Sequence, residues 1–308
     1  MKIVVALGGN AMTAPDGSSS PDDQRRAIAV AADHIGDLVA AGHDVVVTHG
    51  NGPQVGNILL KNELAAHMLP PVSMDWCGAQ TQGTIGFTLV NALERSLAAR
   101  SFDRKVVALV SRSLVKRDDP ALEEPTKPVG PYFSAEEARE KQADGQVWRD
   151  FGAKGWRRVV ASPDPVRMLD APAITSLVNA GYLVVANGGG GIPVVETDTG
   201  VRGVEAVIDK DLGAYLLAVE VGADLLIIAT DVPQAVVRFG ELDAEPLGRL
   251  DPTEMRRLIA EGHFAQGSMG PKVEAVTRFA EAGGTGVITA LDHLAEAAAG
   301  EIGTIVQT

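Results

Sequence analysis

The sequence predicts an α/β fold in which a mainly parallel sheet is covered by helices on both faces. Apolar runs of strand length alternate with longer amphipathic or alanine-rich stretches, which is the pattern of repeated β-α-β units. Hydrophobic residues make up 45% of the 308 residues and aromatic residues only 4%, so the core must be built from Ala, Val, Leu and Ile. Such aliphatic runs are typical of parallel strands that are buried on both faces.

The expected elements alternate along the chain. The predicted strands are the apolar runs 2–7, 44–48, 105–110, 182–186, 224–229, 286–289 and 303–306. The predicted helices are 21–41, 53–66, 78–99, 165–180, 204–221, 252–261, 271–282 and 291–299. Pro21 and Pro53 stand near first helical positions, where a missing N–H has no cost. Gly42, Gly181 and Gly222 follow helical runs, where a left-handed cap is favoured.

The segment 115–163 interrupts this alternation. It contains many prolines and charged residues and two of the three tryptophans, Trp148 and Trp156. A long surface loop would account for this composition, but long insertions in compact domains are often functional. We therefore predict a small lobe that acts as a lid or covers the substrate.

Charge and cysteine content exclude several classes of protein. The formal net charge of −13 argues against nucleic acid as the main partner, because phosphate backbones require a basic surface. A single cysteine, Cys77, excludes an internal disulfide framework. The apolar run 2–7 is too short for a signal peptide, and no stretch approaches the roughly 20 apolar residues that span a bilayer. We expect a cytoplasmic protein without membrane partners.

Three glycine-rich turns each follow a predicted strand. Glycine lets backbone N–H groups approach an anion, and a following helix adds its positive N-terminus. Because ligands bind at the carboxyl ends of strands in open α/β sheets, the turns together could cradle a polyphosphate and a second anion. The side chains of Asn10 and Asn51 add further donors. The candidate phosphate-binding residues are Gly8, Gly9, Asn10, Gly50, Asn51, Gly52, Gly189 and Gly190.

Other readings of these turns remain open. The spacing of Gly50, Gly52 and Gly56 resembles a variant dinucleotide fingerprint, so an NAD(P)-dependent oxidoreductase is an alternative. Glycines at strand ends are also common in any tightly wound α/β fold. The phosphate-binding loop of P-loop enzymes and the signature strings of protein kinases are both missing from the sequence.

Three lysines stand in unusual settings. Lys127 is flanked by prolines within the insertion, Lys210 precedes Asp211, and Lys272 follows Pro271, which we expect at the start of a helix. A cation in the first helical turn is unfavourable unless an anion binds there. Phosphoryl transfer needs mainly positioning and charge neutralisation, which lysines, backbone N–H groups and Mg²⁺ supply. Asp211 is either an ordinary helix-face carboxylate or the residue that holds two of the lysines.

The histidines give no sign of a general base. His49 lies beside the second glycine turn, and we interpret it as structural. The spacing of His, Asp and Glu residues predicts no permanent metal site made by the protein alone. An acceptor that is already an anion would need no general base.

These strings together resemble carbamate kinases, within the broader amino-acid kinase fold family. The similar segments run through most of the chain in family order: VVALGGNA at 4–11, HGNGPQVGN at 49–57, TQG at 81–83, PTKPVGP at 125–131, GWRRVV at 155–160, GGGGIPVV at 188–195, 203–211, and GSM with PK at 267–272. The proline-flanked lysine string and the GWR string separate carbamate kinases from acetylglutamate and aspartate kinases.

The resemblance implies a three-layer αβα sandwich. Residues 1–308 would form one domain, with a protruding subdomain near 115–163, and two chains would form a homodimer. The implied reaction converts ATP and carbamate reversibly to ADP and carbamoyl phosphate with Mg²⁺, running towards ATP in arginine fermentation. Another carboxylate kinase of the same fold is the nearest alternative, and a catalytically silent nucleotide sensor is a further one.

The resemblance also assigns site residues. Lys127 would reach the carbamoyl phosphate from the subdomain, Lys210 and Lys272 would neutralise the transferring phosphoryl group, and Asp211 would organise the lysines. The first two glycine turns would hold the acceptor and the transferred group. The implied nucleotide-binding residues are Thr230, Asp231, Val232, Gly267, Ser268 and Met269.

Overall fold

A computed structural model describes residues 1–12, 20–143, 145–264 and 268–308. These residues form a central eight-stranded sheet with the strand order β15-β17-β16-β12-β1-β2-β9-β3. All seven predicted strands belong to it, with small shifts at their ends. The strands are β1 (Lys2–Leu7), β2 (Asp44–His49), β3 (Val106–Ala108), β9 (Leu183–Val185), β12 (Leu225–Thr230), β15 (Arg249–Leu250), β16 (Thr285–Ala290) and β17 (Thr304–Val306).

The strands at the centre of the sheet are parallel and end together. In β1, Leu7 pairs with His49 of β2 on one side and with Ala229 of β12 on the other. The antiparallel pair β16 and β17 lies towards one edge. The turns that follow β1, β2 and β12 therefore meet at one edge of the sheet, where an open α/β sheet binds its ligands.

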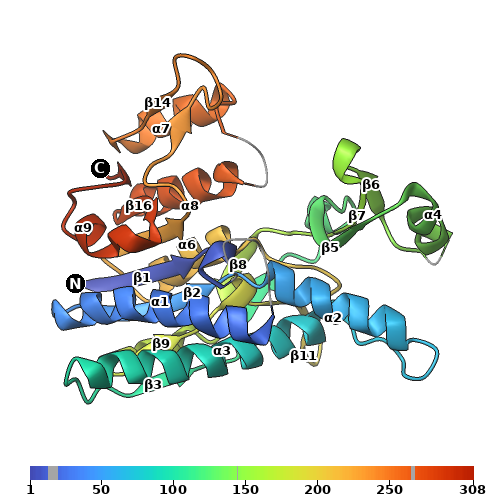
Figure 1. Ribbon diagram of the computed structural model, residues 1–308, viewed down its shortest axis with the longest axis horizontal. Coiled ribbons are helices and arrows are strands. Elements are labelled where there is room, and N and C mark those ends of the chain that lie inside the picture. The colour runs from blue at the N-terminus through green and yellow to red at the C-terminus, as the bar shows by residue number, and fades with distance from the viewer. Residues whose placement is uncertain (13–19, 144, 265–267) are drawn as a thin grey trace.

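Helices cover both faces, so the three-layer αβα prediction is confirmed (Figure 1). Alternate residues of the β1 run point to opposite faces, and both sets are buried. One face packs against α1 (Pro21–Ala40), α3 (Met74–Ala99) and α9 (Leu294–Ala298). The other face packs against α5 (Ala171–Asn179), α6 (Lys210–Glu220), α7 (Pro252–Ala260) and α8 (Met269–Glu281). The remaining long helix, α2 (Gly52–Ala65), extends towards a separate lobe.

A second sheet was missed by the sequence analysis. Among the described residues it has four strands in the order β11-β10-β4-β8: β4 (Arg112–Val115), β8 (Pro165–Met168), β10 (Ile192–Thr197) and β11 (Gly200–Gly203). The predicted helix 165–180 was therefore wrong at its start, because 165–168 is a strand. The predicted helix 204–221 begins only at Lys210, since Asp209 is its N-cap and accepts a hydrogen bond from Asp211 N.

The insertion forms a lobe that stands apart from the central sheet. In the described part of the chain it contains a three-stranded antiparallel sheet, β5 (Lys127–Phe133), β7 (Trp156–Val160) and β6 (Trp148–Asp150), and the helix α4 (Ala135–Ala143). We refer to residues 115–163 as the subdomain. It lies beyond the carboxyl ends of the central strands, next to α2 (Figure 1).

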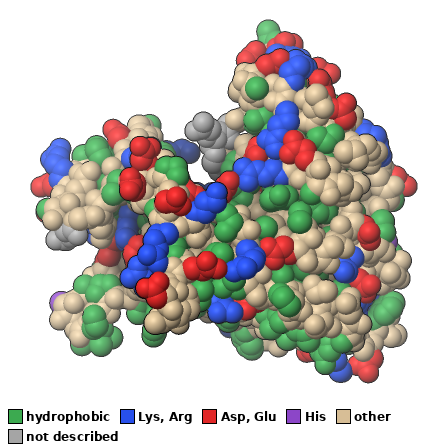
Figure 2. All heavy atoms as spheres, turned by 180° about the vertical axis from the view of Figure 1, so that it is seen from behind, with side chains coloured by type: hydrophobic (Ala, Val, Ile, Leu, Met, Phe, Trp, Pro, Cys, Tyr) green, Lys and Arg blue, Asp and Glu red, His purple; other side chains and the backbone are tan. Residues whose placement is uncertain are grey.

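The surface carries acidic and basic side chains side by side. On the face seen in Figure 2, the Lys and Arg side chains alternate with Asp and Glu and form no uniform basic area. None of the helices in the described ranges is long and apolar enough to cross a membrane.

Candidate active site

A cavity of about 310 Å³ opens where β1 and β12 end. Its lining combines glycines of the first turn, two lysines and residues that follow β12. The described residues that line it are Gly8, Gly9, Ala11, Lys210, Ala229, Thr230, Asp231, Ser268, Lys272 and Leu291. The set contains two lysines and one aspartate, so the cavity suits an anionic ligand.

Lys210 and Lys272 reach the cavity from the starts of two helices. Lys210 is the first residue of α6, and Lys272 lies in the first turn of α8. Asp211 accepts hydrogen bonds from both: one oxygen from Lys210 Nζ, the other from Lys272 Nζ at 3.1 Å. The side chain of Asp211 is only 4% exposed. One buried carboxylate thus holds two ammonium groups at the positive ends of two helices. An anion bound there would be stabilised by the two charges and by the two helix dipoles.

The start of α8 differs from the prediction. The helix begins at Met269, with Ser268 as the N-cap, and not at Pro271. Pro271 still falls within the first turn, where its missing N–H removes no helical hydrogen bond. Lys272 is the fourth helical residue, so its predicted place in the first turn is confirmed.

The charges of this cluster shift its pKa values. Burial lowers the pKa of Lys210, as does the positive charge of Lys272, while the carboxylate of Asp211 opposes the shift. Burial alone would raise the pKa of Asp211, but the charges of the two lysines and their hydrogen bonds outweigh it and place this pKa below its usual range. Asp211 is therefore ionised at neutral pH and cannot serve as a proton donor there.

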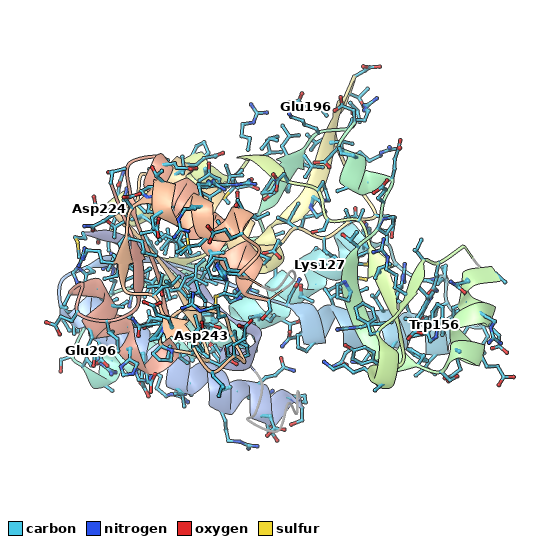
Figure 3. The ribbon with its side chains drawn as sticks, turned by 90° about the horizontal axis from the view of Figure 1, so that it is seen from above. Lys127, Trp156, Glu196, Asp224, Asp243 and Glu296 are labelled. Atoms are coloured by element: carbon cyan, nitrogen blue, oxygen red, sulfur yellow. The ribbon has the colours of Figure 1, made fainter. Side chains whose placement is uncertain are left out.

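Lys127 belongs to the subdomain and is not among the described residues that line the cavity. As the first residue of β5, it lies at the junction between the central domain and the lobe that carries Trp156 (Figure 3). Its ammonium group forms an ion pair and hydrogen bond with Oδ2 of Asp209, the N-cap residue of α6. Oδ1 of the same carboxylate accepts from Asp211 N at 2.9 Å. Asp209 thus connects the subdomain lysine to the helix that carries Lys210.

Gly8 and Gly9 of the first glycine turn line the cavity, whereas Gly50 of the second turn packs against Lys210, and Gly50, Asn51 and Gly52 are not among the described lining residues. Gly8 N donates to Ala229 O at 3.1 Å, and Gly50 N donates to Leu7 O at 3.0 Å, which fixes each turn to a neighbouring strand. A Cβ at Gly50 would lie 3.0 Å from Cδ of Lys210, and one at Gly8 would lie 3.0 Å from Ala229 O. Larger residues there would push against Lys210 and against β12.

The third glycine turn has a different place. Gly189 and Gly190 belong to the 3-10 turn η4 (Gly188–Gly190), are buried and do not line the cavity. A Cβ at Gly189 would lie 2.3 Å from Nδ2 of Asn51, and one at Gly213 of α6 would lie 2.6 Å from Cα of Gly190. The structure thus shows close packing beneath the site at these glycines, which the sequence analysis predicted to bind phosphate.

The other predicted residues fall into three groups. Asn51 is the N-cap residue of α2, and its Nδ2 donates to Thr81 Oγ1 at 2.9 Å, so it braces α2 against α3. Val232 and Met269 are close in sequence to cavity residues but do not line the cavity themselves. Asn10 lies in the 3-10 turn η1 (Gly9–Met12), and Gly267 falls outside the described residues.

His49 is buried at the end of β2, 1% exposed. Its Nδ1 donates to Gly50 O at 2.7 Å, since a carbonyl can only accept. Burial lowers the pKa of His49 to about 4, although the hydrogen bond to Gly50 opposes the shift. The ring is neutral at physiological pH and fixes the second glycine turn, which agrees with the structural role that we expected.

This shift predicts a pH dependence of stability. The folded pKa of about 4 lies below the ordinary 6.5, so the unfolded chain binds this proton more readily. The neutral ring of His49 therefore contributes its full share to the free energy of unfolding above about pH 6.5. This contribution, about 3 kcal/mol in total, is lost as the pH falls towards 4. Urea unfolding at several pH values should show a smaller loss on acidification in His49→Gln than in the wild type. Parallel curves for the two proteins would contradict this assignment.

Asp209 is the site residue that the sequence analysis missed. It lies in the string 203–211 that resembles the family, but neither that string nor the resemblance predicts a role for it. An N-cap signal was available, because an Asp directly before a helix is a preferred cap. Its pairing with Lys127 could not be read from sequence, since the two residues are 82 positions apart.

The fold and the cavity correspond to one family. The sequence model of the Amino acid kinase family matches residues 1–290 of the chain. Together with the parallel sheet and the lysine-lined cavity at its carboxyl edge, this match defines the protein as a phosphotransferase of the amino acid kinase class.

Comparison with individual relatives shows which family within this class the chain belongs to. The carbamate kinase of Thermococcus kodakarensis is 44% identical over 311 residues, which cover 99% of this chain and 98% of the relative. The carbamate kinase-like protein YahI of Escherichia coli is 44% identical over 314 residues, with 99% of each chain covered. A structure of carbamate kinase from Giardia lamblia bound to AMP-PNP has a TM-score of 0.93 at 38% identity, covering 99% of this chain and 98% of that one. The chain belongs to the carbamate kinase family, which confirms the resemblance.

Proposed function

We propose that the protein transfers a phosphoryl group reversibly between ATP and carbamate, forming ADP and carbamoyl phosphate. The observation that carries this proposal is the pair of lysines held by Asp211 in the cavity that Gly8 and Gly9 of the first glycine turn also line. Full-length similarity to proteins named carbamate kinase supports the choice of acceptor.

The geometry explains how the residues of this chain would assist the transfer. In ATP formation, an oxygen of ADP attacks the phosphorus of carbamoyl phosphate, the bond from phosphorus to the carbamate oxygen breaks, and carbamate leaves as an anion. Lys210 and Lys272 approach the migrating group from two helix starts and neutralise its charge. No proton has to be removed from the acceptor in the reverse direction, which fits a cavity lined by lysines and without a histidine among the described lining residues.

The cavity also fits a magnesium ion bound by the nucleotide. Mg²⁺ in such enzymes is held mainly by substrate phosphates with one or two carboxylates. Asp211 is occupied by two lysines, whereas Asp231 is the one carboxylate among the described residues that line the cavity. We infer that Asp231 would assist in holding the ion, which supplies further charge neutralisation when bound with ADP or ATP. Thr230 Oγ1 donates to Asp231 Oδ1 at 3.0 Å and would orient the carboxylate.

A coupled assay tests the proposal. Purified protein mixed with carbamoyl phosphate, ADP and Mg²⁺ should form ATP, and omission of Mg²⁺ should abolish the reaction. The same protein offered acetylglutamate and ATP should show no comparable turnover. Activity on that carboxylate, with none on carbamoyl phosphate, would replace the proposal with the alternative carboxylate kinase.

The dinucleotide alternative has little structural support. Gly56, the last glycine of that pattern, lies against Gly130 of the subdomain rather than facing open space. An NAD(P)-dependent oxidoreductase would also leave the lysine cluster without a role.

Lys127 is proposed to position the acceptor from the subdomain. We expect Lys127→Ala to raise the KM for carbamoyl phosphate and to lower kcat by less than the loss of Lys210 or Lys272, since Lys127 would contact the acceptor rather than the migrating group. The exposed Lys154 in the same lobe provides a matched control, and Lys154→Ala should behave like the wild type. Steady-state kinetics with each substrate varied in turn would measure the effect. An unchanged KM for carbamoyl phosphate would contradict this role.

Further parts of the proposal concern assembly and physiology. A homodimer is supported by large apolar side chains exposed on and after α2 and on α3: Leu64, Met68, Leu69, Trp76 and Phe87. Light scattering of the purified protein would reveal a monomer if this were wrong. ATP formation during arginine fermentation in the cytoplasm remains the expected physiological role, and the growth of a deletion strain on arginine would test it.

A further inference from the structure

Two glycines bring the subdomain into direct backbone contact with α2. Gly56 lies on α2, four residues after the phosphate-turn residue Gly52, and Gly130 lies on β5, three residues after Lys127. A Cβ built on Gly56 would lie 2.8 Å from Cα and 3.1 Å from N of Gly130. Only a residue without a side chain allows this approach, and the obstructing atoms are backbone atoms that cannot rotate away.

The Gly130 side of this contact is fixed by its own strand. Gly130 has φ +72°, in the left-handed region, and lies where the pairing of β5 with β7 shifts register between Val129 and Tyr132. Its carbonyl accepts a hydrogen bond from Arg157 Nε at 2.7 Å. The bulge is therefore held by the neighbouring strand and cannot move away without distorting the small sheet.

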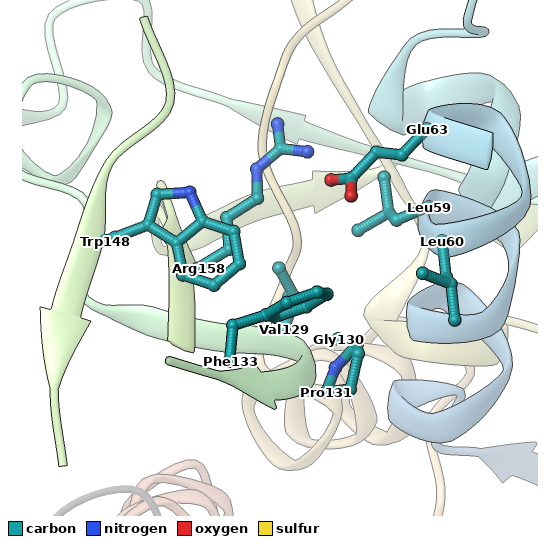
Figure 4. Close-up of a pocket in the computed structure, with 9 residues that line it drawn as sticks. All are labelled: Leu59, Leu60, Glu63, Val129, Gly130, Pro131, Phe133, Trp148 and Arg158. Atoms are coloured by element: carbon teal, nitrogen blue, oxygen red, sulfur yellow. The ribbon is translucent and has the colours of Figure 1, made fainter. Parts of the chain in front are cut away.

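An apolar cluster fixes the α2 side. Side chains of β5 and β7 pack there against α2 and the start of α3, and the buried members are Val55, Leu59, Met74, Cys77, Val129 and Val160. In Figure 4, Leu59 and Leu60 of α2 face Val129 and Phe133 across the same boundary. The space left there is about 10 Å³, roughly the room for one water molecule.

An ion pair supports the boundary further along α2. Lys141 of α4 pairs with Glu63 at 2.5 Å, and both side chains are 22% exposed. The subdomain is thus joined to α2 by backbone contact, apolar packing and charge. The same α2 begins at the Gly50–Gly52 turn that lies beneath Lys210.

We propose that the Gly56–Gly130 contact sets the distance of Lys127 from the cavity, so that Gly56 is a positioning residue for the acceptor. One rigid helix connects the turn under the transferred group with the strand that carries Lys127. The inference rests on the proposed role of Lys127. It states that Gly56, which would itself contact no ligand, determines where Lys127 lies.

The variant Gly56→Ala tests the inference. Normal contacts between carbon atoms need about 3.5–4.0 Å, so the new methyl group must move β5 away from α2 by about 1 Å. Misplacement by that distance can reduce a rate by about 100-fold. We expect kcat/KM for carbamoyl phosphate to fall about 10- to 100-fold with a raised KM, while the KM for ADP changes less than about twofold.

A structural role would give a different result. Alanine favours a helix more than glycine does, so α2 itself should be at least as stable in the variant. A Gly56→Ala protein that failed to fold, or that lost affinity for both substrates equally, would overturn the inference. Gly83→Ala is the matched control, because a Cβ at this helical glycine of α3 meets nothing within 4 Å. Any general effect of Gly-to-Ala replacement, or an effect through a subunit contact near α3, would appear in the control as well.

A crystal structure of Gly56→Ala separates this inference from the proposed function. If the wild type shows no activity on carbamoyl phosphate, the proposed function fails, but the displacement of β5 can still be measured. We expect Lys127 Nζ to move away from its position beside Asp209 by about 1 Å relative to the wild type. An unmoved Lys127 in a well-folded variant would contradict the positioning role, whichever reaction the protein catalyses.

Discussion

Lys210→Ala and Lys272→Ala are each expected to lower kcat for ATP formation at least about 100-fold, equivalent to about 2.7 kcal/mol of transition-state stabilisation. Each lysine brings a charge to the cavity from the start of a helix, and both are mostly buried, with 16% and 14% of the side chain exposed. Charges act more strongly in such a partly desolvated site than in water. Because the lysines would stabilise the migrating group rather than the bound substrates, kcat should fall more than the two KM values rise.

Coupled measurement of ATP at saturating substrates would give these values. Lys105 provides a control, since it is 67% exposed and pairs with the nearby Asp103 at the surface. Lys105→Ala should retain wild-type kcat. If Lys210→Ala or Lys272→Ala retained near-normal turnover, the role proposed for that lysine would be wrong, even if the protein proved to be an active kinase.

Asp211→Asn is expected to lower kcat by a comparable factor, although it leaves both lysines in the chain. The amide preserves the shape of the side chain but leaves two neighbouring ammonium groups without their shared negative charge. Removing one partner from a buried ion pair typically costs about 3–5 kcal/mol, within the 5–15 kcal/mol by which proteins are commonly stable, so the variant should still fold. We expect a loss in kcat of at least about 100-fold at neutral pH. Without the carboxylate, the positive charge of Lys210 is less favoured and both lysines lose the partner that holds them in place.

The pH dependence gives a more specific test of Asp211. Its carboxylate opposes the lowering of the pKa of Lys210, so its loss should lower that pKa further. A lysine is charged below its pKa, and the remaining activity of Asp211→Asn should therefore rise as the pH is lowered from about 9 to about 6. Asp33→Asn, which alters an exposed pair with Arg100, is a suitable control. A variant whose pH profile matched the wild type would show that Asp211 does not control the charge of Lys210.

The sequence predicted the central layers well because their pattern is local. A buried parallel strand must be apolar on both faces, and the run Lys2–Leu7 satisfies that requirement without reference to the rest of the chain. Gly8 could be placed beside the cavity and Gly50 beside Lys210 because each follows such a strand directly. Lys272 could be placed there because a cation in a first helical turn contradicts local electrostatics.

The remaining features depend on contacts between distant segments. Gly189 comes soon after a strand, yet it packs against Asn51, and the next glycine of that turn, Gly190, packs against Gly213 of α6. The pattern of Pro165–Met168 predicts the start of a helix rather than a strand, since the run is short and its pairing partners in β4 lie 50 to 55 positions earlier. The boundaries and the substrate-covering role of the subdomain remain predictions.

The ion pair between Lys127 and Asp209 has a consequence for ligand entry. The subdomain lysine has a carboxylate partner within the protein itself. An arriving anion must compete with that carboxylate, so its binding is an exchange of counterions and not the filling of an unoccupied charge. The same ion pair joins the lobe to the N-cap residue of α6, so a phosphate that took over the ammonium group would also remove this link between lobe and sheet.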